Sequence, residues 1–272
     1  MAETYADKNQ EYWNRAAEAV HKDKWVHDLQ AQISGFLKSN VDWLTLPKDS
    51  QGNRQAKLMD YACGNGIVTR SLHNLFSQCI GVDLAEGMLA KYCATAADIG
   101  LSEPQMMAVQ GNLLASPVEA TKPPLSQEQL SNFDLVAICM ALHHVDDINL
   151  AIKRLAERLR PGGVLLVIDW AKRDTTGDSA STNGHQDASA SHHDQNGHEQ
   201  QQHQYRHPEH HHQPHPASHT ISHDSFTEEQ MVGLFEGAGC GQSSFVQADR
   251  LSDVPGARTG KMQLFFARAT KL

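Results

Sequence analysis

Two glycines follow a short apolar run in the segment LMDYACGNGIVTR, residues 58–70. The carboxylate of Asp60 precedes them, and a run that predicts a helix begins directly after Gly66. A glycine turn between a strand and a helix lets a cofactor approach the backbone closely, because no side chain stands in the way. This segment therefore indicates a cofactor site that begins at Gly64.

The spacing of these glycines disfavours two common nucleotide-binding turns. The dinucleotide fingerprint G-x-G-x-x-G has a third glycine for close packing of helix against strand, and Thr69 stands at that position. The carboxylate of Asp60 would repel a pyrophosphate and attract an ammonium group. A P-loop needs Gly-Lys-Ser/Thr after the turn, and this sequence has none there. The turn favours a cofactor that carries positive charge.

Histidines supply the candidate general bases. His143 and His144 directly follow the apolar run FDLVAICMAL, whereas His219 and His223 precede the last predicted helix. Imidazole titrates near neutral pH, which suits a group that takes a proton from a substrate. We expect His143 or His144 to be catalytic, with His223 as a further candidate. The alternative is that the histidine pair only packs and forms hydrogen bonds.

These residues need a scaffold, and the hydrophobic pattern predicts alternating strands and helices. A first helix is expected over 10–38, with Trp25, Leu29, Ile33 and Phe36 on one face. Strands alternating with helices favour a parallel, doubly wound α/β sheet. The expected strands lie at 56–62, 78–84, 105–111, 133–142, 164–170, 243–249 and 262–269. The expected later helices lie at 67–76, 85–100, 146–159 and 227–239, with RPGG ending the third of them and a capping box at Thr227 and Gln230 beginning the last.

Five of these motifs, in order, resemble the class I S-adenosylmethionine-dependent methyltransferases of the ubiquinone-biosynthesis type. They are MDYACGNG, GVDLAEGML, VQGN, FDLVAICMALHHVDD and LRPGGVLLVIDW. The resemblance covers roughly residues 55–170 and 219–270. It implies a Rossmann-like, doubly wound, seven-stranded sheet with only the last strand antiparallel. It also implies S-adenosyl-L-methionine as the cofactor, bound across the carboxyl ends of the first strands.

The resemblance carries a set of cofactor-binding roles onto this sequence. It implies that Asp60 attracts the ammonium group and that Asp83 accepts from both ribose hydroxyls. Asn112 stands where the family usually has an acid, so its amide would receive the adenine amino group. The residues implied to bind the cofactor are Asp60, Ala62, Cys63, Gly64, Gly66, Asp83, Leu84, Met88, Gly111, Asn112 and Met140. For Met88, which would flank adenine with Leu84, a plain core role is the alternative.

The chain organisation is expected to be a helical lid over 1–50 and a methyltransferase domain over 51–272. From Ala171 to Thr220 there is no Val, Ile, Leu, Met, Phe or Trp, and twelve of the 17 histidines lie between His185 and His223. Such a segment buries too little apolar surface to offset the conformational entropy lost when it becomes ordered. We predict a disordered His-rich insertion at about 172–218. Its irregular spacing is typical of low complexity, and no metal site is expected.

Composition limits the partners. The formal net charge is −9 and no cluster of five or more Lys and Arg occurs, so direct binding of nucleic acid is disfavoured. No apolar run is long enough to span a membrane. The five cysteines contain no C-x-x-C pair and the first ten residues are polar. We expect free thiols, no signal peptide, and a cytoplasmic or nuclear protein.

Two functions remain open. The first is transfer of a methyl group to a small molecule or to a protein side chain. The second is a methyltransferase-fold binding subunit or pseudoenzyme, paired as a homodimer or heterodimer with another such subunit. The Asn/Asp-Pro-Pro-Tyr motif of enzymes that methylate exocyclic or amide nitrogens is absent, since CMAL stands in its place.

Overall fold

A computed structural model describes residues 4–46, 56–115, 119–173 and 217–272. Its central sheet has seven strands in the order β3-β2-β1-β4-β5-β8-β6, and the two-residue strand β7 pairs with β8. The strands are β1 Lys57–Tyr61, β2 Gln78–Asp83, β3 Met106–Gln110, β4 Phe133–Cys139, β5 Leu159–Ala171, β6 Cys240–Gln247, β7 Ser252–Asp253 and β8 Lys261–Lys271.

The strand directions confirm the expected fold class. Strands β1 to β5 pair in parallel, whereas β8 runs antiparallel to both β5 and β6. The seven-stranded sheet with an antiparallel last strand is therefore as predicted, and β7 is an addition. Because β1, β2, β4 and β5 are parallel neighbours, their carboxyl ends meet at one edge. That edge is where open α/β sheets bind ligands.

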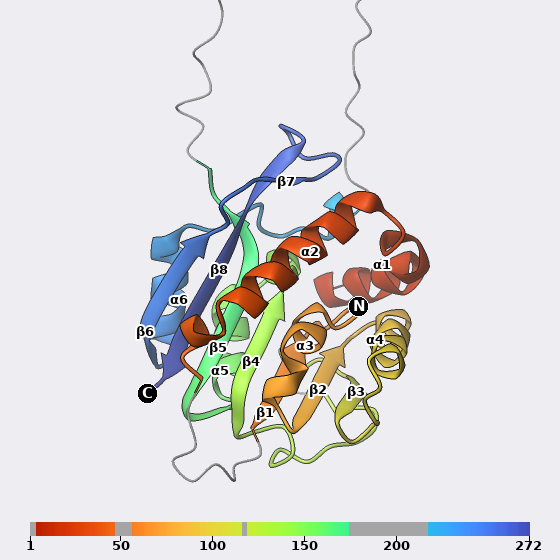
Figure 1. Cartoon of the computed structure of the whole chain (residues 1–272), viewed down its shortest axis with the longest axis vertical. Coiled ribbons are helices and arrows are strands. Elements are labelled where there is room, and N and C mark those ends of the chain that lie inside the picture. The colour runs from red at the N-terminus through yellow and green to blue at the C-terminus, as the bar shows by residue number, and fades with distance from the viewer. Residues whose placement is uncertain (1–3, 47–55, 116–118, 174–216) are drawn as a thin grey trace, which may run out of the picture. The chain divides into compact units, whose positions relative to one another are not determined.

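Helices cover both faces of the sheet (Figure 1). In the view shown, α2 and α3 lie in front of the strands and α5 and α6 lie behind them. The α-helices are α1 Tyr5–Val20, α2 Lys24–Ser39, α3 Ile67–Leu72, α4 Glu86–Asp98, α5 Ile148–Ala156 and α6 Glu228–Gly237. The short 3-10 helices are η1 Val41–Leu44, η2 His73–Leu75, η3 Leu142–His144 and η5 Ser218–Thr220.

The core forms two main apolar layers, one on each face of the sheet. Leu29 and Ile33 of α2 pack with Val68 of α3 against one face. Residues of α5 and α6, such as Ile152 and Phe235, pack against the other. The apolar strands predicted from the sequence are thus buried on both sides, as parallel strands usually are.

The N-terminal region differs from the prediction of one helix over 10–38. Two helices form instead, and the chain changes direction between His21, the last cap residue of α1, and Asp23, the first cap residue of α2. The two helices bury different neighbours, because Ala17 of α1 packs with Met88 of α4 whereas α2 packs on the sheet. One straight helix could not make both contacts.

Two smaller expectations about element ends were tested. The capping box at the start of α6 is confirmed, since Thr227 and Gln230 each accept from the other's backbone N–H. Asp147 begins α5 and accepts from the backbone N–H of Leu150. Helix α5 ends at Ala156, ahead of the segment RPGG that was predicted to stop it, and RPGG lies at the start of β5. A register shift between β4 and β5 accommodates it.

The predicted His-rich insertion falls almost entirely outside the described residues. Within the described ranges, no helix combines the length and the apolar character that crossing a bilayer requires.

Candidate cofactor site and histidine pair

The glycine turn connects β1 to α3 at the edge where the strands end. Gly64 and Gly66 have φ of +52° and +77°, a left-handed backbone that glycine adopts without strain. Ala62 also has a positive φ, +53°, which is uncommon for a residue with a side chain. The turn is fixed by two backbone bonds, from Cys63 N–H to Val82 O at 3.2 Å and from Gly66 N–H to Cys63 O at 2.7 Å.

Asp83 ends β2 beside this turn. Its Oδ2 accepts from the backbone N–H of Gly64 at 3.0 Å, and its Oδ1 accepts from the backbone N–H of Ala85 at 2.9 Å. Burial raises the pKa of the Asp83 carboxyl, and these backbone bonds lower it in part. The carboxylate is thus held against the glycine turn.

Asp60 lies under the turn and is 1% exposed. Its Oδ2 accepts from the backbone N–H of Thr69 at 3.1 Å and from the Thr69 hydroxyl at 2.8 Å. Burial raises the pKa of Asp60 to about 7, the Thr69 bonds lower it, and the charge of Asp83 raises it. Neither Asp60 nor Asp83 has an ion pair with a cationic side chain in the described part of the chain. Two neighbouring carboxylates of this kind favour a ligand with positive charge.

The residues expected near adenine lie beyond β2 and β3. The carbonyl of Leu84 accepts from Gln10 at 3.1 Å and from Gln110 at 3.2 Å. Asn112 Oδ1 accepts from Leu114 N–H at 3.1 Å. The same oxygen also accepts from the Tyr61 hydroxyl at 3.4 Å, so both of its lone pairs are engaged within the protein.

Four other residues expected to bind the cofactor already make close contacts within the protein. Met88 is buried with Ala17 of α1. The Cys63 thiol packs among side chains of α4 and β3, and burial raises its pKa well above the usual value. A Cβ on Gly111 would lie 2.8 Å from Thr121. Met140, at φ +54°, donates its backbone N–H to Ile168 O at 2.8 Å.

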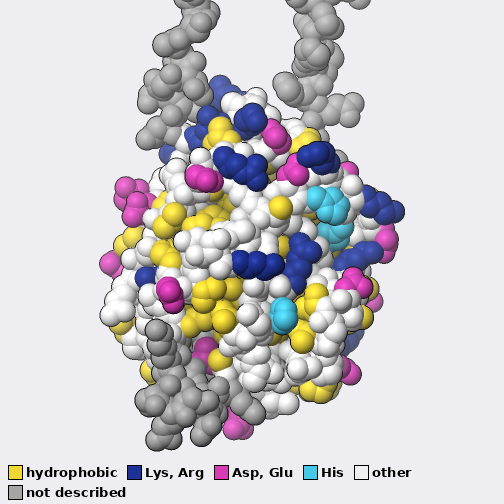
Figure 2. All heavy atoms as spheres, viewed as in Figure 1, with side chains coloured by type: hydrophobic (Ala, Val, Ile, Leu, Met, Phe, Trp, Pro, Cys, Tyr) yellow, Lys and Arg dark blue, Asp and Glu magenta, His cyan; other side chains and the backbone are white. Residues whose placement is uncertain are grey.

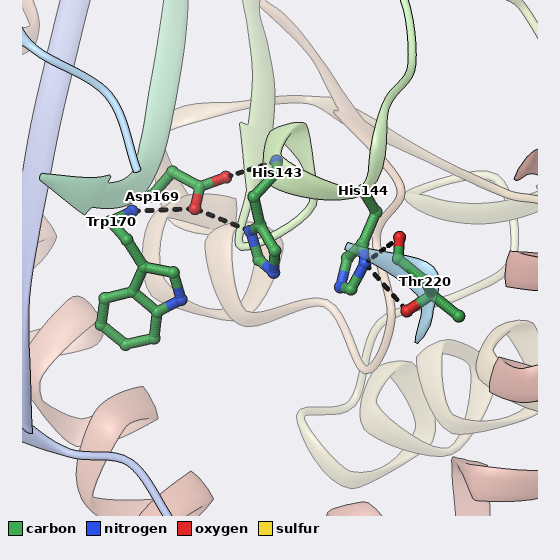
Figure 3. Close-up of polar contacts among 5 residues, drawn as sticks. All are labelled: His143, His144, Asp169, Trp170 and Thr220. Carbon is green, nitrogen blue, oxygen red and sulfur yellow. Dashed lines mark hydrogen bonds and ion pairs between the residues drawn. The ribbon is translucent and has the colours of Figure 1, made fainter. Parts of the chain in front are cut away.

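His143 and His144 form η3, directly beyond β4. Figure 3 shows both imidazole rings pointing the same way, with Asp169 beside one and Thr220 beside the other. The ring centroids are 4.1 Å apart. His143 Nδ1 lies 2.7 Å from Asp169 Oδ1, and its backbone N–H donates to Asp169 Oδ2 at 3.1 Å. A carboxylate only accepts, so we assign the proton to Nδ1, which leaves Nε2 as the basic nitrogen of the neutral ring.

His144 is oriented by Thr220 of η5. Its Nδ1 lies 3.0 Å from the carbonyl oxygen and 3.1 Å from the hydroxyl of Thr220. The Thr220 hydroxyl donates to Ala217 O at 2.7 Å, so it receives a proton from His144 Nδ1. The structure therefore brings both predicted histidines together and gives each ring a defined partner.

His223 joins the same region through a different contact. Its backbone N–H donates to His143 O at 3.1 Å, whereas its ring Nε2 lies 3.4 Å from the carbonyl oxygen of Asp146. The ring also lies 5.9 Å from that of Phe226. The contacts of His223 thus link η3 to the start of α6.

Helix α1 contacts this edge of the sheet. The Asn9 amide donates to His144 O at 3.3 Å, and the ring of Trp13 lies 5.5 Å from that of His144. On the other side, Tyr12 meets His219 at 5.3 Å between ring centroids. The helix thus contacts the histidine pair, as a lid would.

Charged side chains of both signs lie on α1 and α2, which together carry four Lys or Arg and four Asp or Glu. Figure 2 shows Lys, Arg and His side chains over these two helices, with Asp and Glu side chains among them. A cavity of about 270 Å³ on α1 is lined by Lys8, Glu11, Arg15 and His219. Arg15 is ion-paired with Glu11 at 3.1 Å, so the lining of this cavity is of mixed charge.

Comparison with known proteins places the chain in a family. Residues 25–240 match the methyltransferase domain family. The chain belongs to this family. It is 29% identical over 152 residues to an uncharacterized methyltransferase of Schizosaccharomyces pombe, covering 55% of this chain and 51% of that protein. It is 32% identical over 160 residues to the ubiquinone/menaquinone biosynthesis C-methyltransferase UbiE of Pseudomonas aeruginosa, covering 58% of this chain and 59% of that protein.

A solved structure shares the methyltransferase fold. The magnesium protoporphyrin IX methyltransferase of Synechocystis PCC 6803, solved with bound S-adenosylmethionine, aligns with a TM-score of 0.58 at 13% identity, covering 100% of this chain and 99% of that one. The sequence relatives, by contrast, are matched over only a little more than half of their own length.

Sequence reasoning missed two residues of this candidate site. Asp169 is 0% exposed and fixes the ring of His143. Its signal was available, since it ends an apolar strand expected to lie beside the one before His143, and parallel neighbours end at the same edge. Thr220 had no such signal, because it follows a low-complexity segment and its partner is far away in the sequence.

Proposed function

We propose that this protein transfers the methyl group of S-adenosylmethionine to a small molecule or to a protein side chain. The observation that carries the proposal is the pair of carboxylates at the glycine turn, Asp60 under it and Asp83 beside it. Neither is ion-paired among the described residues. A sulfonium cofactor that also carries an ammonium group supplies the missing positive charge. Family membership and the bound cofactor of the Synechocystis relative support the same choice.

Each cofactor residue has a role in this proposal. Asp83 receives the ribose hydroxyls and the second oxygen of Asp60 receives the ammonium group. The methionine part lies along the backbone of Gly64 and Gly66. The remaining contacts, to adenine and to the methyl-bearing end, come from Ala62, Cys63, Leu84, Met88, Gly111, Asn112 and Met140.

His143 is the general base of the proposed reaction. Methyl transfer from a sulfonium is an in-line displacement on an already activated carbon, so the protein mainly supplies alignment. A base is needed where the acceptor loses a proton, as a hydroxyl does. Asp169 would stabilise the imidazolium that forms when His143 Nε2 takes that proton. The pair therefore favours an acceptor with an acidic O–H or C–H over one that is already a free nucleophile.

His144 and His223 have supporting roles. The Thr220 carbonyl and hydroxyl fix the His144 ring next to that of His143, where it can contact the acceptor. His223 holds η3 in place through the His143 carbonyl. Helix α1 covers the acceptor and excludes water.

The proposal also covers the cellular compartment, the methyl acceptor and the assembly of the protein. All five cysteines are free, which supports a reducing compartment such as the cytoplasm or nucleus. The acceptor is a small molecule or a protein side chain. A homodimer or a heterodimer with another methyltransferase-like subunit is the proposed assembly.

Calorimetry with S-adenosylmethionine, its demethylated product and NAD tests the cofactor. We expect binding of the first two and not of NAD, and preferential binding of NAD would contradict the proposal. A screen of acceptors with labelled methyl groups then tests turnover. Cofactor binding without transfer to any acceptor, alone or with a partner subunit, would instead support the binding-subunit alternative.

A further inference from the structure

A chain of buried hydroxyl groups leads from α4 to the carboxylate under the glycine turn. The Tyr92 side chain, from the middle of α4, is 0% exposed. Its hydroxyl lies 3.1 Å from the Thr69 hydroxyl, which in turn donates to Asp60 at 2.8 Å. Elements β1, α3 and α4 thus meet through three polar side chains in an otherwise apolar region.

The direction of each proton in this chain follows from the donors available. Thr69 has one hydroxyl proton, and the Asp60 carboxylate can only accept it. Tyr92 must therefore donate to the Thr69 oxygen. Burial raises the pKa of Tyr92 well above its usual value, so this donor keeps its proton.

The chain also decides which oxygen of Asp60 is available to a ligand. Both bonds from Thr69, from its backbone N–H and its hydroxyl, reach Oδ2. Within the described residues Oδ1 accepts no hydrogen bond. The carboxylate is thus oriented with one oxygen fixed to Thr69 and the other left for a donor from outside.

Two glycines leave room for the tyrosine ring. A Cβ on Gly81 of β2 would lie 2.4 Å from the Tyr92 ring, and one on Gly66 would lie 2.9 Å from it. Real Cβ atoms essentially never come this close to another atom. Gly66 therefore has a second role besides admitting the cofactor, because the Tyr92 ring occupies the space that a Cβ would take.

We propose that Tyr92 and Thr69 are positioning residues of the cofactor site, which favour the ionised form of Asp60 and direct its second oxygen towards the cofactor's ammonium group. This rests on the proposed function. The charge on Asp60 then distinguishes substrate from product. S-adenosylmethionine carries a net charge of about +1, and its demethylated product is about neutral because the sulfonium is lost. A carboxylate kept ionised by the hydroxyl chain favours the methylated form and aids product release.

The test measures the affinity of both cofactor forms against pH. Calorimetry runs from about pH 5.5 to about 8.5, on either side of the Asp60 pKa of about 7. A cation favours ionised Asp60, so wild-type affinity for S-adenosylmethionine falls as pH drops through this range. In Y92F and T69V the carboxylate loses support, so the midpoint moves to higher pH. At neutral pH we expect roughly three- to tenfold weaker binding, with near-normal affinity at the alkaline end.

Controls separate positioning from simple packing. T69S keeps the hydroxyl and should restore the wild-type midpoint. S71A removes another buried hydroxyl from the same helix, one that donates to Ile67 O and not to Asp60, and should leave the midpoint unchanged. D60N should abolish the pH dependence.

Three results would overturn the inference. They are a wild-type midpoint in both Y92F and T69V, an equal loss of affinity at every pH, and an S71A shift as large as theirs. These failures differ from failure of the proposed function, in which the wild-type protein would not bind S-adenosylmethionine at any pH.

Discussion

Replacing Asp169 by asparagine tests whether the histidine pair is catalytic. The carboxylate accepts three N–H groups, from His143 Nδ1, from the His143 backbone and from the Trp170 backbone. An asparagine has one oxygen for these three donors. If its NH₂ group faces Nδ1, it donates to the ring and moves the ring proton to Nε2, which removes the base. If its oxygen faces Nδ1, the imidazolium loses its negative partner.

The size of the effect follows from these contacts. A general base contributes about 10²–10⁴ to the rate, which corresponds to about 2.7–5.4 kcal/mol in the barrier. We expect D169N and H143A each to lose turnover within this range. Either orientation of the new amide also leaves a buried N–H of the backbone without an acceptor, so D169N should lose about 1–3 kcal/mol of stability.

The assay is methyl transfer from labelled cofactor to the acceptor found in the screen, measured with cofactor affinity and urea unfolding on the same samples. Turnover should fall while cofactor affinity stays within about twofold. H144A is the matched comparison. The ring of His144 is held by Thr220 and not by a carboxylate, so its removal should reduce turnover less than removal of the His143 ring. Wild-type turnover in H143A would show that His143 is not the general base. Joint loss of folding, cofactor binding and turnover would support a packing role.

Three further outcomes are expected. Asp83→Ala should weaken cofactor binding by about tenfold or more, roughly 1–3 kcal/mol, since ribose hydroxyls would lose a buried acceptor; unchanged affinity in calorimetry would remove Asp83 from the site. Gly81→Ala should destabilise the fold by about 1–3 kcal/mol in urea unfolding, because the new methyl group meets the Tyr92 ring; a wild-type midpoint would show that the ring moves at little cost. Replacing residues 174–215 by a short Gly/Ser linker should preserve folding, cofactor binding and methyl transfer, because loop length contributes little free energy; loss of transfer alone would mean that the segment reaches the active site.

Local chemistry made most of the scaffold predictable. Apolar runs marked the buried strands, and the capping box of Thr227 and Gln230 marked where α6 begins. The glycine turn was recognisable because its function depends on a backbone that only a few residue types adopt. These are features that neighbouring residues determine among themselves.

The contacts that pair distant residues were not predictable in the same way. Tyr92 looked like any helical residue, because its hydroxyl partner Thr69 and the space at Gly81 appear only when α4 packs on β2. The division between α1 and α2 was missed because continuous periodicity cannot show that two parts of a segment pack on different neighbours. Such choices depend on tertiary contacts, which compete with local preference.

The described residues on either side of the His-rich segment are anchored independently of it. Lys172 N–H donates to Phe226 O at 2.8 Å, and Phe226 N–H donates to Trp170 O at 2.9 Å. The turn that carries Thr220 closes on itself, through the bond from Thr220 N–H to Ala217 O at 2.9 Å. A chain cut between these anchors would give one fragment ending in the open edge of β5 and another beginning before the η5 turn and carrying β8. Because β5 and β8 pair over eight residues, the two pieces carry complementary edges. The fold is thus suited to reassembly from two fragments, with the contact between His144 and Thr220 formed only when both fragments meet.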